Sequence, residues 1–362
     1  MKKKVLILTD SSRHIDVESL FPITRHLVSN SQIDSVYVAD RADVENAPFY
    51  HSHSLNFTRF YARRVDDRYA LETTGTFYPA SMIPIDDFDA VWIRLDHPVT
   101  DDFLKYVQAL MPAHFIINDP DGLIKTRSKA FLLELSGVLG DAMPPLTLCN
   151  TAQEVEDFKK HYESGVVLKQ LESFGGRGVV RYRDSKETDL QNRDDVANYL
   201  AENGPCIAMK YLDPQIGQSD DRIVVANGVA ICALRRTPGK AGWLCNLTSG
   251  GMAEDVTPRQ DEIDIVELLD PVMRRHGIFL YGADLLLDEK GRRVLSEINT
   301  LNVGGITESE AFNGRSLSKF IADYMATIIA ERDLQVTAAD RRIIEAPGDV
   351  LPLFAKTTLE TC

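Results

Sequence analysis

The sequence is poor in the residues that build disulfide frameworks and zinc sites. Only five cysteines occur in 362 residues, and no two of them have the CxxC spacing. Cysteines scattered in this way argue against a zinc site and against a disulfide-stapled secreted domain. We therefore expect reduced thiols and a cytoplasmic protein. The cysteines are Cys149, Cys206, Cys232, Cys245 and Cys362.

Long hydrophobic runs are also missing. The start, MKKKVLILTD, is basic and then apolar, but the apolar stretch ends at Thr9 and Asp10. This pattern is typical of a strand and is too short for a signal peptide. No run of about 18 apolar residues occurs, so we expect no transmembrane helix and no membrane partner.

Positive charge is in short supply. Asp and Glu outnumber Lys and Arg by 54 to 40, which gives a formal net charge of −14. A chain of this charge is poorly suited to a polyphosphate backbone, so we expect no nucleic-acid partner. The length, with 44% hydrophobic residues, favours two or three compact units, each with its own core.

Several catalytic signatures are absent. No G-x-S-x-G occurs, and no cysteine has a nearby histidine in a known nucleophile pattern, so acyl-enzyme chemistry is unsupported. The histidines lack metal-ligand spacing. The stretch LTDSSRH after the first strand lacks the glycines of a dinucleotide fingerprint, which excludes a dinucleotide oxidoreductase.

The order of apolar segments predicts an α/β protein. VLILTD, a helix from about Asp16 to Ser29 and DSVYVAD read as strand, helix and strand, and a similar pass follows up to about Pro120. The stretch 41–84 is predicted as a long loop with short strands. From Lys129 onward the pattern changes to helices interspersed with antiparallel hairpins, and no role is assigned to the tail 336–362.

A hairpin near the end of this pattern carries two acids and an amide. Folding ADLLLDEKGRRVLSEIN on its DEKG turn places Asp284 opposite or diagonal to Glu297, and strand alternation puts Asn299 on the same face as Glu297. Three oxygen donors at a strand end suit Mg²⁺ shared with nucleotide phosphates. The solvated polar face of an amphipathic hairpin explains the pattern equally well.

A glycine-rich loop follows a strand-borne lysine in LKQLESFGGRGVV. Lys169 ends the strand, and Gly175, Gly176 and Gly178 would let backbone N–H groups approach a phosphate. The loop matches neither the Walker pattern nor the dinucleotide pattern. A hairpin turn without function is the alternative.

Two further segments indicate a nucleotide site only when they are considered together with the hairpin and the glycine-rich loop. KYLDP, after the strand PCIAM, could offer backbone groups to an adenine edge, or it could be an edge strand turning at a proline. The hairpin RIVVANGVAICALRR turns at Asn227 and Gly228, which brings Arg222 near Arg236 across the sheet. Arginine forks match carboxylates and phosphates, although most arginines are simply exposed.

Taken in order, these segments resemble the ATP-grasp superfamily, and most of all bacterial glutathione synthetases. The resemblance runs from about Phe88 to Arg332. The segments that carry it are NDPDGLIKTRSKAFLLEL, VVLKQLESFGGRGVVRY, PCIAMKYL, DDRIVVANG, RRTPG with CNLTSGG, GADLLLD and SEIN.

The resemblance implies an ATP-grasp fold, α+β in its ATP domain, behind a Rossmann-like N-terminal domain. The expected units are an N-terminal α/β substrate domain at 1–120, a small lid domain at 121–205, a large domain at 206–335 and the tail. The implied reaction is ATP-dependent ligation of a carboxylate to an amine through an acyl phosphate. It needs ATP with two Mg²⁺ ions, or Mn²⁺, and small amino-acid or peptide substrates. The family also implies a homo-oligomer, either dimer or tetramer.

The resemblance assigns roles by position. ATP phosphates would be bound by Lys129, Lys169, Gly175 and Gly176. Adenine would lie along Met209, Lys210, Tyr211 and Leu212, with Asp213 near the ribose. Metal ions would be bound by Asp284, Glu297 and Asn299. Arg236 and Asn246 would steady the transferring phosphoryl group, and Arg222 would face the acceptor substrate. Further substrate contacts would come from Arg94, Asn302, Gly304 and Gly305.

The departures from the family fall where substrates bind. TLNVGGI stands where glutathione synthetases have a Ser-Pro-Thr type turn, and IRLDHP keeps Arg94, Asp96 and Pro98 of the family segment but loses its lysine. Two ligase hypotheses follow, one with γ-glutamylcysteine and glycine and one with other amino acids or peptides. A non-catalytic nucleotide-binding protein is a third, which predicts lost lysines or metal ligands.

Overall fold

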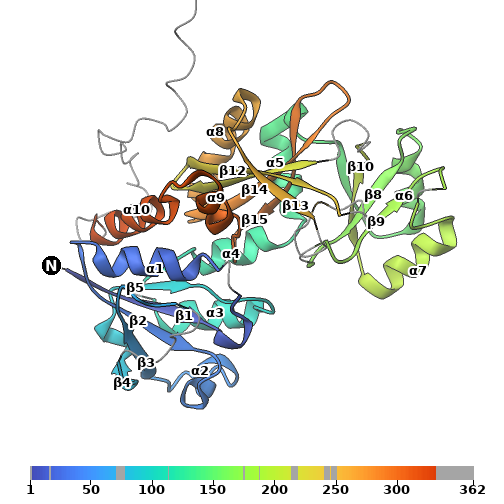
Figure 1. Ribbon diagram of the computed structural model, residues 1–362. Coiled ribbons are helices and arrows are strands. Elements are labelled where there is room, and N and C mark those ends of the chain that lie inside the picture. Colours follow the sequence, from blue (N-terminus) through green and yellow to red (C-terminus); the bar gives the residue numbers. More distant parts are fainter. Residues whose placement is uncertain are drawn as a thin grey trace, which may run out of the picture.

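The computed structural model describes residues 2–15, 18–70, 78–112, 114–173, 176–186, 188–212, 219–239, 245 and 251–331. The predictions for Gly175, Asp213, Asn246 and the tail 336–362 lie outside these ranges. Three sheets form an elongated molecule, with the N-terminal sheet at one end and the smallest sheet at the other (Figure 1). Among the described helices, none is long and apolar enough to cross a bilayer.

The N-terminal sheet has the order β4-β3-β2-β1-β5-β6, in which β2, β1, β5 and β6 are parallel. The strands are β1 (Lys3–Thr9), β2 (Ile33–Asp40), β3 (Arg59–Val65), β4 (Ser81–Pro84), β5 (Ala90–Ile93) and β6 (Phe115–Ile117). Its helices are α1 (Leu20–Ser29), α2 (Ala47–Tyr50) and α3 (Asp101–Leu110), with 3-10 turns at Ser11–Arg13, Val44–Asn46 and Ile85–Asp87. The helix expected from about Asp16 begins at Leu20, because the described residues Glu18 and Ser19 before it are not helical.

The smallest sheet, which we call the lid sheet, has the order β7-β10-β8-β9 and is antiparallel. Its elements are β7 (Leu146–Cys149), α6 (Ala152–Lys159), β8 (Val166–Gln170), β9 (Val179–Tyr182), α7 (Arg193–Asn203) and β10 (Cys206–Lys210). The helix α6 begins with the capping box of Thr151 and Glu154. The expected boundary at 205/206 falls immediately before β10, yet β10 pairs with both β7 and β8 and therefore belongs to the lid sheet.

The central sheet has the order β13-β12-β11-β14-β15 and is also antiparallel. Its strands are β11 (Asp220–Ala226), β12 (Val229–Thr237), β13 (Met252–Val256), β14 (Leu280–Leu287) and β15 (Arg293–Asn299). The helices around it are α4 (Pro120–Arg127), α5 (Phe131–Leu139), α8 (Gln260–Arg275), α9 (Ile306–Asn313) and α10 (Leu317–Glu331), with a 3-10 turn at Gly140–Ala142. The predicted hairpin turn is confirmed, because Asn227 and Gly228 both have positive φ, at 51° and 78°.

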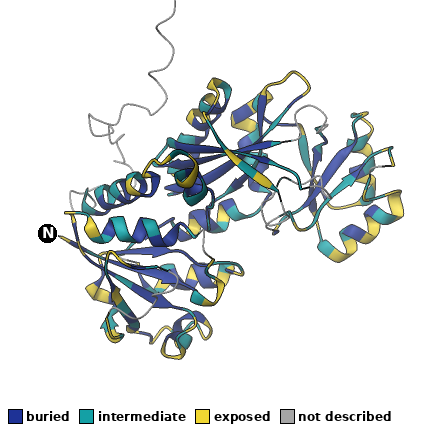
Figure 2. Cartoon of the chain, in the orientation of Figure 1, coloured by how far each residue is buried: buried dark blue, intermediate teal, exposed yellow. Residues whose placement is uncertain are grey.

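The apolar cores show how these units are joined. The lid sheet has a core of its own, formed with α6 and α7. The N-terminal and central sheets instead share two cores, and in one of them α1 packs against α10. The helix α5, expected in the lid domain, packs on α8 of the central unit. Figure 2 shows the buried strands of all three sheets, with the exposed residues on the outer helices and turns.

A buried amide fixes the N-terminal unit against the central sheet. Asn118, directly after β6, donates from Nδ2 to the carbonyls of Leu280 and Thr300, both at 2.7 Å. Its Oδ1 accepts from the backbone N–H groups of Phe279 and Leu280, at 2.8 and 2.9 Å. All four hydrogen-bonding positions of the amide are used, at the point where the chain enters α4.

We expect Asn118→Ala to lower the free energy of unfolding by about 3 kcal/mol, because it leaves buried backbone groups unsatisfied at roughly 1–3 kcal/mol each. Urea unfolding followed by circular dichroism measures the loss. Asn203→Ala, at the end of α7 where the side chain bonds only the carbonyl of Tyr199, serves as the control and should cost less than about 1 kcal/mol. Equal losses in the two variants would contradict the role of Asn118.

Candidate active site

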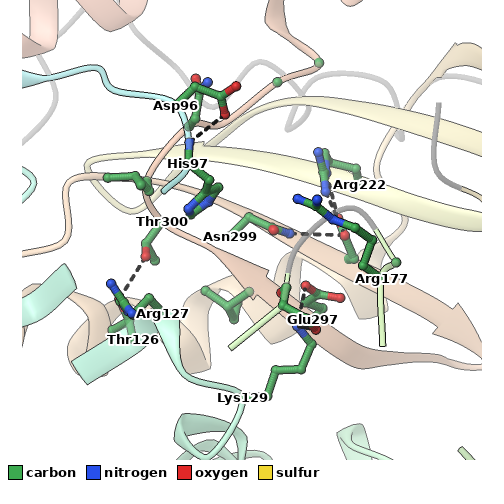
Figure 3. Close-up of a pocket in the computed structure, with 18 of the residues that line it drawn as sticks. Asp96, His97, Thr126, Arg127, Lys129, Arg177, Arg222, Glu297, Asn299 and Thr300 are labelled. Carbon is green, nitrogen blue, oxygen red and sulfur yellow. Dashed lines mark hydrogen bonds and ion pairs between the residues drawn. The ribbon is translucent and has the colours of Figure 1, made fainter. Parts of the chain in front are cut away.

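A cavity of about 1000 Å³ lies where the three units meet. It is lined by the ends of β1 and β5, the segment between α4 and α5, the loop after β8, the central sheet and the turn before α9. Its size is at the upper end of the range for ligand pockets. Figure 3 shows side chains from several of these elements directed into one space.

The two acids and the amide lie together in this cavity. Asp284 on β14 pairs in register with Glu297 on β15, as predicted, and Asn299 pairs with Gly282 on the same strands. Asn299 Nδ2 donates to Asp284 Oδ2 over 3.2 Å. The alternative of a solvated hairpin face is wrong, because these side chains line the cavity and Asp284 is buried.

Two arginines converge on Asp284. Arg222 binds it in a fork, with Nε to Oδ1 at 2.7 Å and Nη2 to Oδ2 at 2.8 Å. Arg236 Nη2 lies 3.0 Å from Asp284 Oδ2 and also binds Asp220. Burial by itself would raise the pKa of Asp284, but the two guanidinium groups outweigh it and hold the pKa well below the usual range of a carboxyl group. The expected proximity of Arg222 and Arg236 is therefore confirmed.

Two lysines reach the same strand, and Lys129 also lines the cavity. Lys129 Nζ lies 3.4 Å from Glu297 Oε1 and donates to the carbonyl of Ser173 over 2.6 Å. Lys169 Nζ donates to both the carbonyl and the hydroxyl of Ser296, at 2.9 Å. Ser296 sits at a bulge that interrupts the pairing of β14 and β15 between Asp284 and Leu285. Both lysines are only about 6% exposed.

The glycine-rich loop lies at the edge of the cavity. Gly176, with a φ of 75°, and the adjacent Arg177 both line it. Gly178 has a φ of 66°, and an added Cβ would lie 2.5 Å from Gln170 Oε1, so this position requires glycine. Gly175 is outside the described residues. The described part of the loop is thus brought to the site as predicted.

The segment predicted to line the adenine does not line the main cavity. The side chains of Met209 and Tyr211 are buried. Lys210 and Leu212 line a second cavity of about 500 Å³ beside the turn between β14 and β15. There Lys210 Nζ pairs with Glu289 Oε1 at 2.7 Å. The structure therefore does not bring this segment together with the metal-side residues in one cavity.

The turn after Asn299 forms another wall. Asn302, Gly304 and Gly305 all line the cavity. Arg94, just after β5, donates from Nη2 to Glu18, to Ser19 and to the carbonyl of Val303 in this turn. Its Nε and Nη1 are buried without a hydrogen-bond partner among the residues that the structure describes. Two nitrogens of a guanidinium at the cavity wall therefore keep unused hydrogen-bonding capacity.

The structure adds cavity residues that the sequence did not single out. They are Arg13, Glu18, His97, Thr126, Arg127, Arg177, Thr300 and Glu308. Thr126 and Arg127 lie inside the segment NDPDGLIKTRSK and Arg177 inside the glycine-rich loop, so adjacency to recognised motifs could have found them. Burial lowers the pKa of His97 to about 4, so this side chain is neutral at pH 7. Arg13, Glu18 and Glu308 carry no sequence signal of this kind.

The donors present fit a hard divalent cation. Two carboxylates and an amide oxygen are ligands that Mg²⁺ and Mn²⁺ accept, and the low pKa of Asp284 keeps it ionised. Across the described ranges, no cluster of three or more His, Cys, Asp or Glu side chains could hold a metal ion by itself. The set here has two acids and an amide, which suits an ion that takes further oxygens from phosphates. Arg222 already binds Asp284, so a cation at this carboxylate must share it or displace the guanidinium.

Comparisons with known proteins agree with this geometry. Residues 131–314, just over half of the chain, match the family model of the prokaryotic glutathione synthetase ATP-grasp domain. Glutathione synthetase of Brucella melitensis biotype 1 is 28% identical over 242 residues, covering 66% of this chain and 73% of that protein. The same enzyme of Prochlorococcus marinus subsp. pastoris is 26% identical over 258 residues, covering 70% and 80%.

Solved structures extend the likeness to the N-terminal unit. D-cycloserine synthetase DcsG aligns with a TM-score of 0.61 and 15% identity, covering 90% of this chain and 99% of that one. The macrocyclase MdnC of Microcystis aeruginosa, bound with its precursor peptide MdnA, aligns with a TM-score of 0.55 and 16% identity, covering 90% and 99%. At these identities the likeness shows a common fold.

The expected fold class is therefore confirmed, and the ligase chemistry expected from the sequence agrees with the family. Lys129 and the metal-side acids line one cavity, and Lys169 contacts the adjacent Ser296, which argues against a non-catalytic relative. The chain belongs to the prokaryotic glutathione synthetase family of ATP-grasp enzymes, ligases that use ATP and a divalent metal to form C–N bonds.

Proposed function

We propose that this ligase activates the carboxylate of a small amino acid or peptide and joins it to an amine. The nominal substrates are γ-glutamylcysteine and glycine, and another pair of amino acids or peptides is the alternative. One observation carries the proposal: Asp284, Glu297, Asn299 and the buried Lys129 line a single cavity. The buried Lys169 contacts Ser296, next to Glu297 on the same strand. This arrangement concentrates metal ligands and cations where phosphate charge must be neutralised.

The reaction proceeds in two steps. A carboxylate oxygen of the first substrate attacks the γ-phosphorus of ATP, and ADP leaves. The amine nitrogen of the second substrate then bonds to the acyl carbon, the C–O bond to phosphate breaks, and the nitrogen loses its proton to form the amide. The protein supplies positioning and charge rather than a nucleophile. Two Mg²⁺ ions, or Mn²⁺ in their place, held by Asp284, Glu297 and Asn299, would neutralise the phosphates.

The remaining roles rest on the likeness to the glutathione synthetase family. Lys129, Lys169 and the glycine loop with Gly175 and Gly176 would bind the phosphates, and the lid sheet that carries Lys169 would cover them against water. We assign adenine to the segment Met209–Leu212 and the ribose to Asp213. Arg236 and Asn246 would steady the phosphoryl group, and Arg222, released from Asp284, would face the acceptor.

Arg94 is proposed to hold a substrate carboxylate. It is 4% exposed, and Nη2 is fixed by Glu18, Ser19 and the Val303 carbonyl. Its Nε and Nη1 are both left without a described partner. A carboxylate that reached either nitrogen would accept a charge-assisted hydrogen bond from it. Asn302 in the adjacent turn would contact the same substrate.

The function is tested by measuring phosphate release from ATP with a panel of acid and amine pairs, followed by mass spectrometry of the amide. Turnover with γ-glutamylcysteine and glycine supports the nominal pair. Turnover only with other pairs would show that those pairs are the substrates. If no pair raises phosphate release above the ATPase background, the ligase proposal for this site is wrong.

A pH dependence follows from the burial of Lys169. Burial lowers its pKa to about 8, below the value of about 10.4 for an exposed lysine. Phosphate beside Nζ favours the charged form, so nucleotide binding takes up a proton above pH 8. We expect the affinity for ADP to fall as the pH rises above about 8, approaching tenfold per pH unit.

Isothermal titration between pH 7 and 9.5 measures this fall. Lys169→Arg stays charged over the whole range and should remove the inflection near pH 8. Lys186→Arg, on an exposed part of the lid, should keep it. An inflection that survives in Lys169→Arg would assign the titration to another group.

We further propose a homo-oligomer, dimer or tetramer, in the cytoplasm. The support is the likeness to the glutathione synthetase family. Sedimentation velocity at micromolar concentration measures the oligomeric state. A single species at the 40.5 kDa mass of one chain would exclude the dimer and the tetramer.

A further inference from the structure

Two neighbouring glycines in the turn after Asn299 differ in the reason for their presence. Gly305 has a φ of 108°, and an added Cβ would lie 2.9 Å from Leu234 Cδ1. Backbone and packing therefore both require glycine there. Gly304 has no positive φ, and an added Cβ would meet no heavy atom of the described structure within 4 Å, its chain neighbours aside. Neither backbone nor packing explains the glycine at 304.

The space at Gly304 belongs to the cavity. Gly304 lines it together with Asn302, Gly305 and Glu308. The turn is held in place, since Arg94 Nη2 donates to the Val303 carbonyl over 3.3 Å and Ser19 Oγ donates to it over 3.4 Å. Val303 itself is 1% exposed and packs in the core shared with α1 and α10. A side chain at position 304 would consequently extend beside the substrates and could not move aside with the turn.

A glycine with no conformational need costs stability, because it adds freedom to the unfolded chain. A glycine at such a position is advantageous only if the absence of a side chain leaves room for another group. On the basis of the ligase function proposed above, we infer that Gly304 makes room for the side chain of the amine substrate. The acceptor is then an α-amino acid larger than glycine, or the N-terminal residue of a peptide, and Gly304 determines specificity for its size.

The test compares acceptors of increasing size in the wild type, Gly304→Ala and Gly304→Val, with the acid substrate fixed. Glycine, alanine, valine and leucine compete in one reaction, and mass spectrometry of the amides gives ratios of kcat/KM. The wild type should favour a larger acceptor over glycine by at least about tenfold, the scale set by a methylene or two in an apolar pocket. Gly304→Val should lower kcat/KM for that acceptor by at least about tenfold and leave glycine within about threefold.

Two controls separate size selection from damage to the fold. Gly137→Ala, in α5 and away from the cavity, also meets no atom within 4 Å in the described structure, and it should leave the acceptor ratio unchanged. Gly304→Ala should keep or slightly raise the wild-type Tm, whereas Gly305→Ala should lower it because of its positive φ. Isothermal titration of the preferred acceptor against the enzyme with ADP gives a readout independent of turnover.

The inference is overturned if the wild type uses glycine at least as well as the larger acceptors, or if Gly304→Val lowers kcat/KM for all acceptors equally. Either result leaves the ligase function intact, because amide product still forms in the wild type. If no acid and amine pair stimulates phosphate release, the proposed function is wrong, and this inference is wrong with it.

Discussion

Glu297→Gln is expected to lower kcat for acid- and amine-dependent phosphate release by at least about 100-fold, the usual cost of removing one group that stabilises developing charge. Glu297 is the residue that pairs with Asp284 across the hairpin and faces Lys129 over 3.4 Å. The amide keeps the size of the side chain but removes the negative charge that attracts a divalent cation. Initial rates at saturating ATP, with Mg²⁺ varied from 1 to about 50 mM, measure the effect, and excess metal should recover part of the rate.

The control is Glu163→Gln, which makes the same chemical change at an exposed residue between α6 and β8. Its rate should stay within about twofold of the wild type, as for surface changes in general. Product formation by Glu297→Gln at the normal rate would refute the mechanism proposed for this site. A lowered rate that no concentration of Mg²⁺ raises would instead remove Glu297 from the metal-binding set.

Lys129→Met is expected to lower kcat/KM for ATP by about 100-fold while the Tm stays equal to, or above, that of the wild type. Lys129 is about 6% exposed and contacts Glu297 and Ser173. Burying an ammonium group costs desolvation energy that one carboxylate at 3.4 Å repays only in part. The side chain of Glu297 is 25% exposed, so water can hydrate its charge once the lysine is removed. Phosphate binding is the step that gains from the buried cation.

Steady-state kinetics and differential scanning calorimetry on the same preparations give both quantities. Lys129→Arg should recover part of the activity, since it restores the charge. Lys125→Met removes an exposed lysine four residues earlier, in α4, that pairs with Glu134, and it should change neither quantity appreciably. A Tm of Lys129→Met well below the wild-type value would show that this lysine is mainly structural.

The separation of activity from stability in these predictions has a common cause. Lys129, Arg222 and Arg236 gather around the carboxylates of β14 and β15 in a cavity that the three units enclose, and Lys169 contacts β15 at Ser296. Removing so many charges from water stabilises the fold little, and the arrangement is advantageous only when phosphates and metal arrive. Lys169 already shows this cost in its lowered pKa.

Local sequence patterns predicted much of the central hairpin. The register of Asp284 with Glu297 followed from counting outward from the DEKG turn, because a hairpin fixes its own pairing once the turn is known. The turn at Asn227 and Gly228 and the capping box at Thr151 and Glu154 were predictable for the same reason. Each depends on residues a few positions apart, so each can be inferred from the sequence without knowledge of the fold.

The place of β10 shows where local patterns fail. PCIAMKYL predicts a strand, but nothing in it shows whether that strand pairs with β8 or with β11. Its pairing between β7 and β8 depends on which apolar faces meet, and this is settled by the packing of the lid core. The same holds for Arg13 and Glu18, which reach the cavity only because the N-terminal sheet docks on the central one.

The sequence by itself determined the ATP-grasp class, the acid and amide at SEIN and the lysines that precede them, because these features depend on short spacings and on the order of segments. Only the tertiary structure decided that Arg94 holds the turn after Asn299, that two nitrogens of its guanidinium lack a described partner, and that Gly305 is required while Gly304 opens onto the cavity. Those facts are contacts between residues up to 209 positions apart. Such contacts arise from the packing of separate units, which no short stretch of sequence encodes.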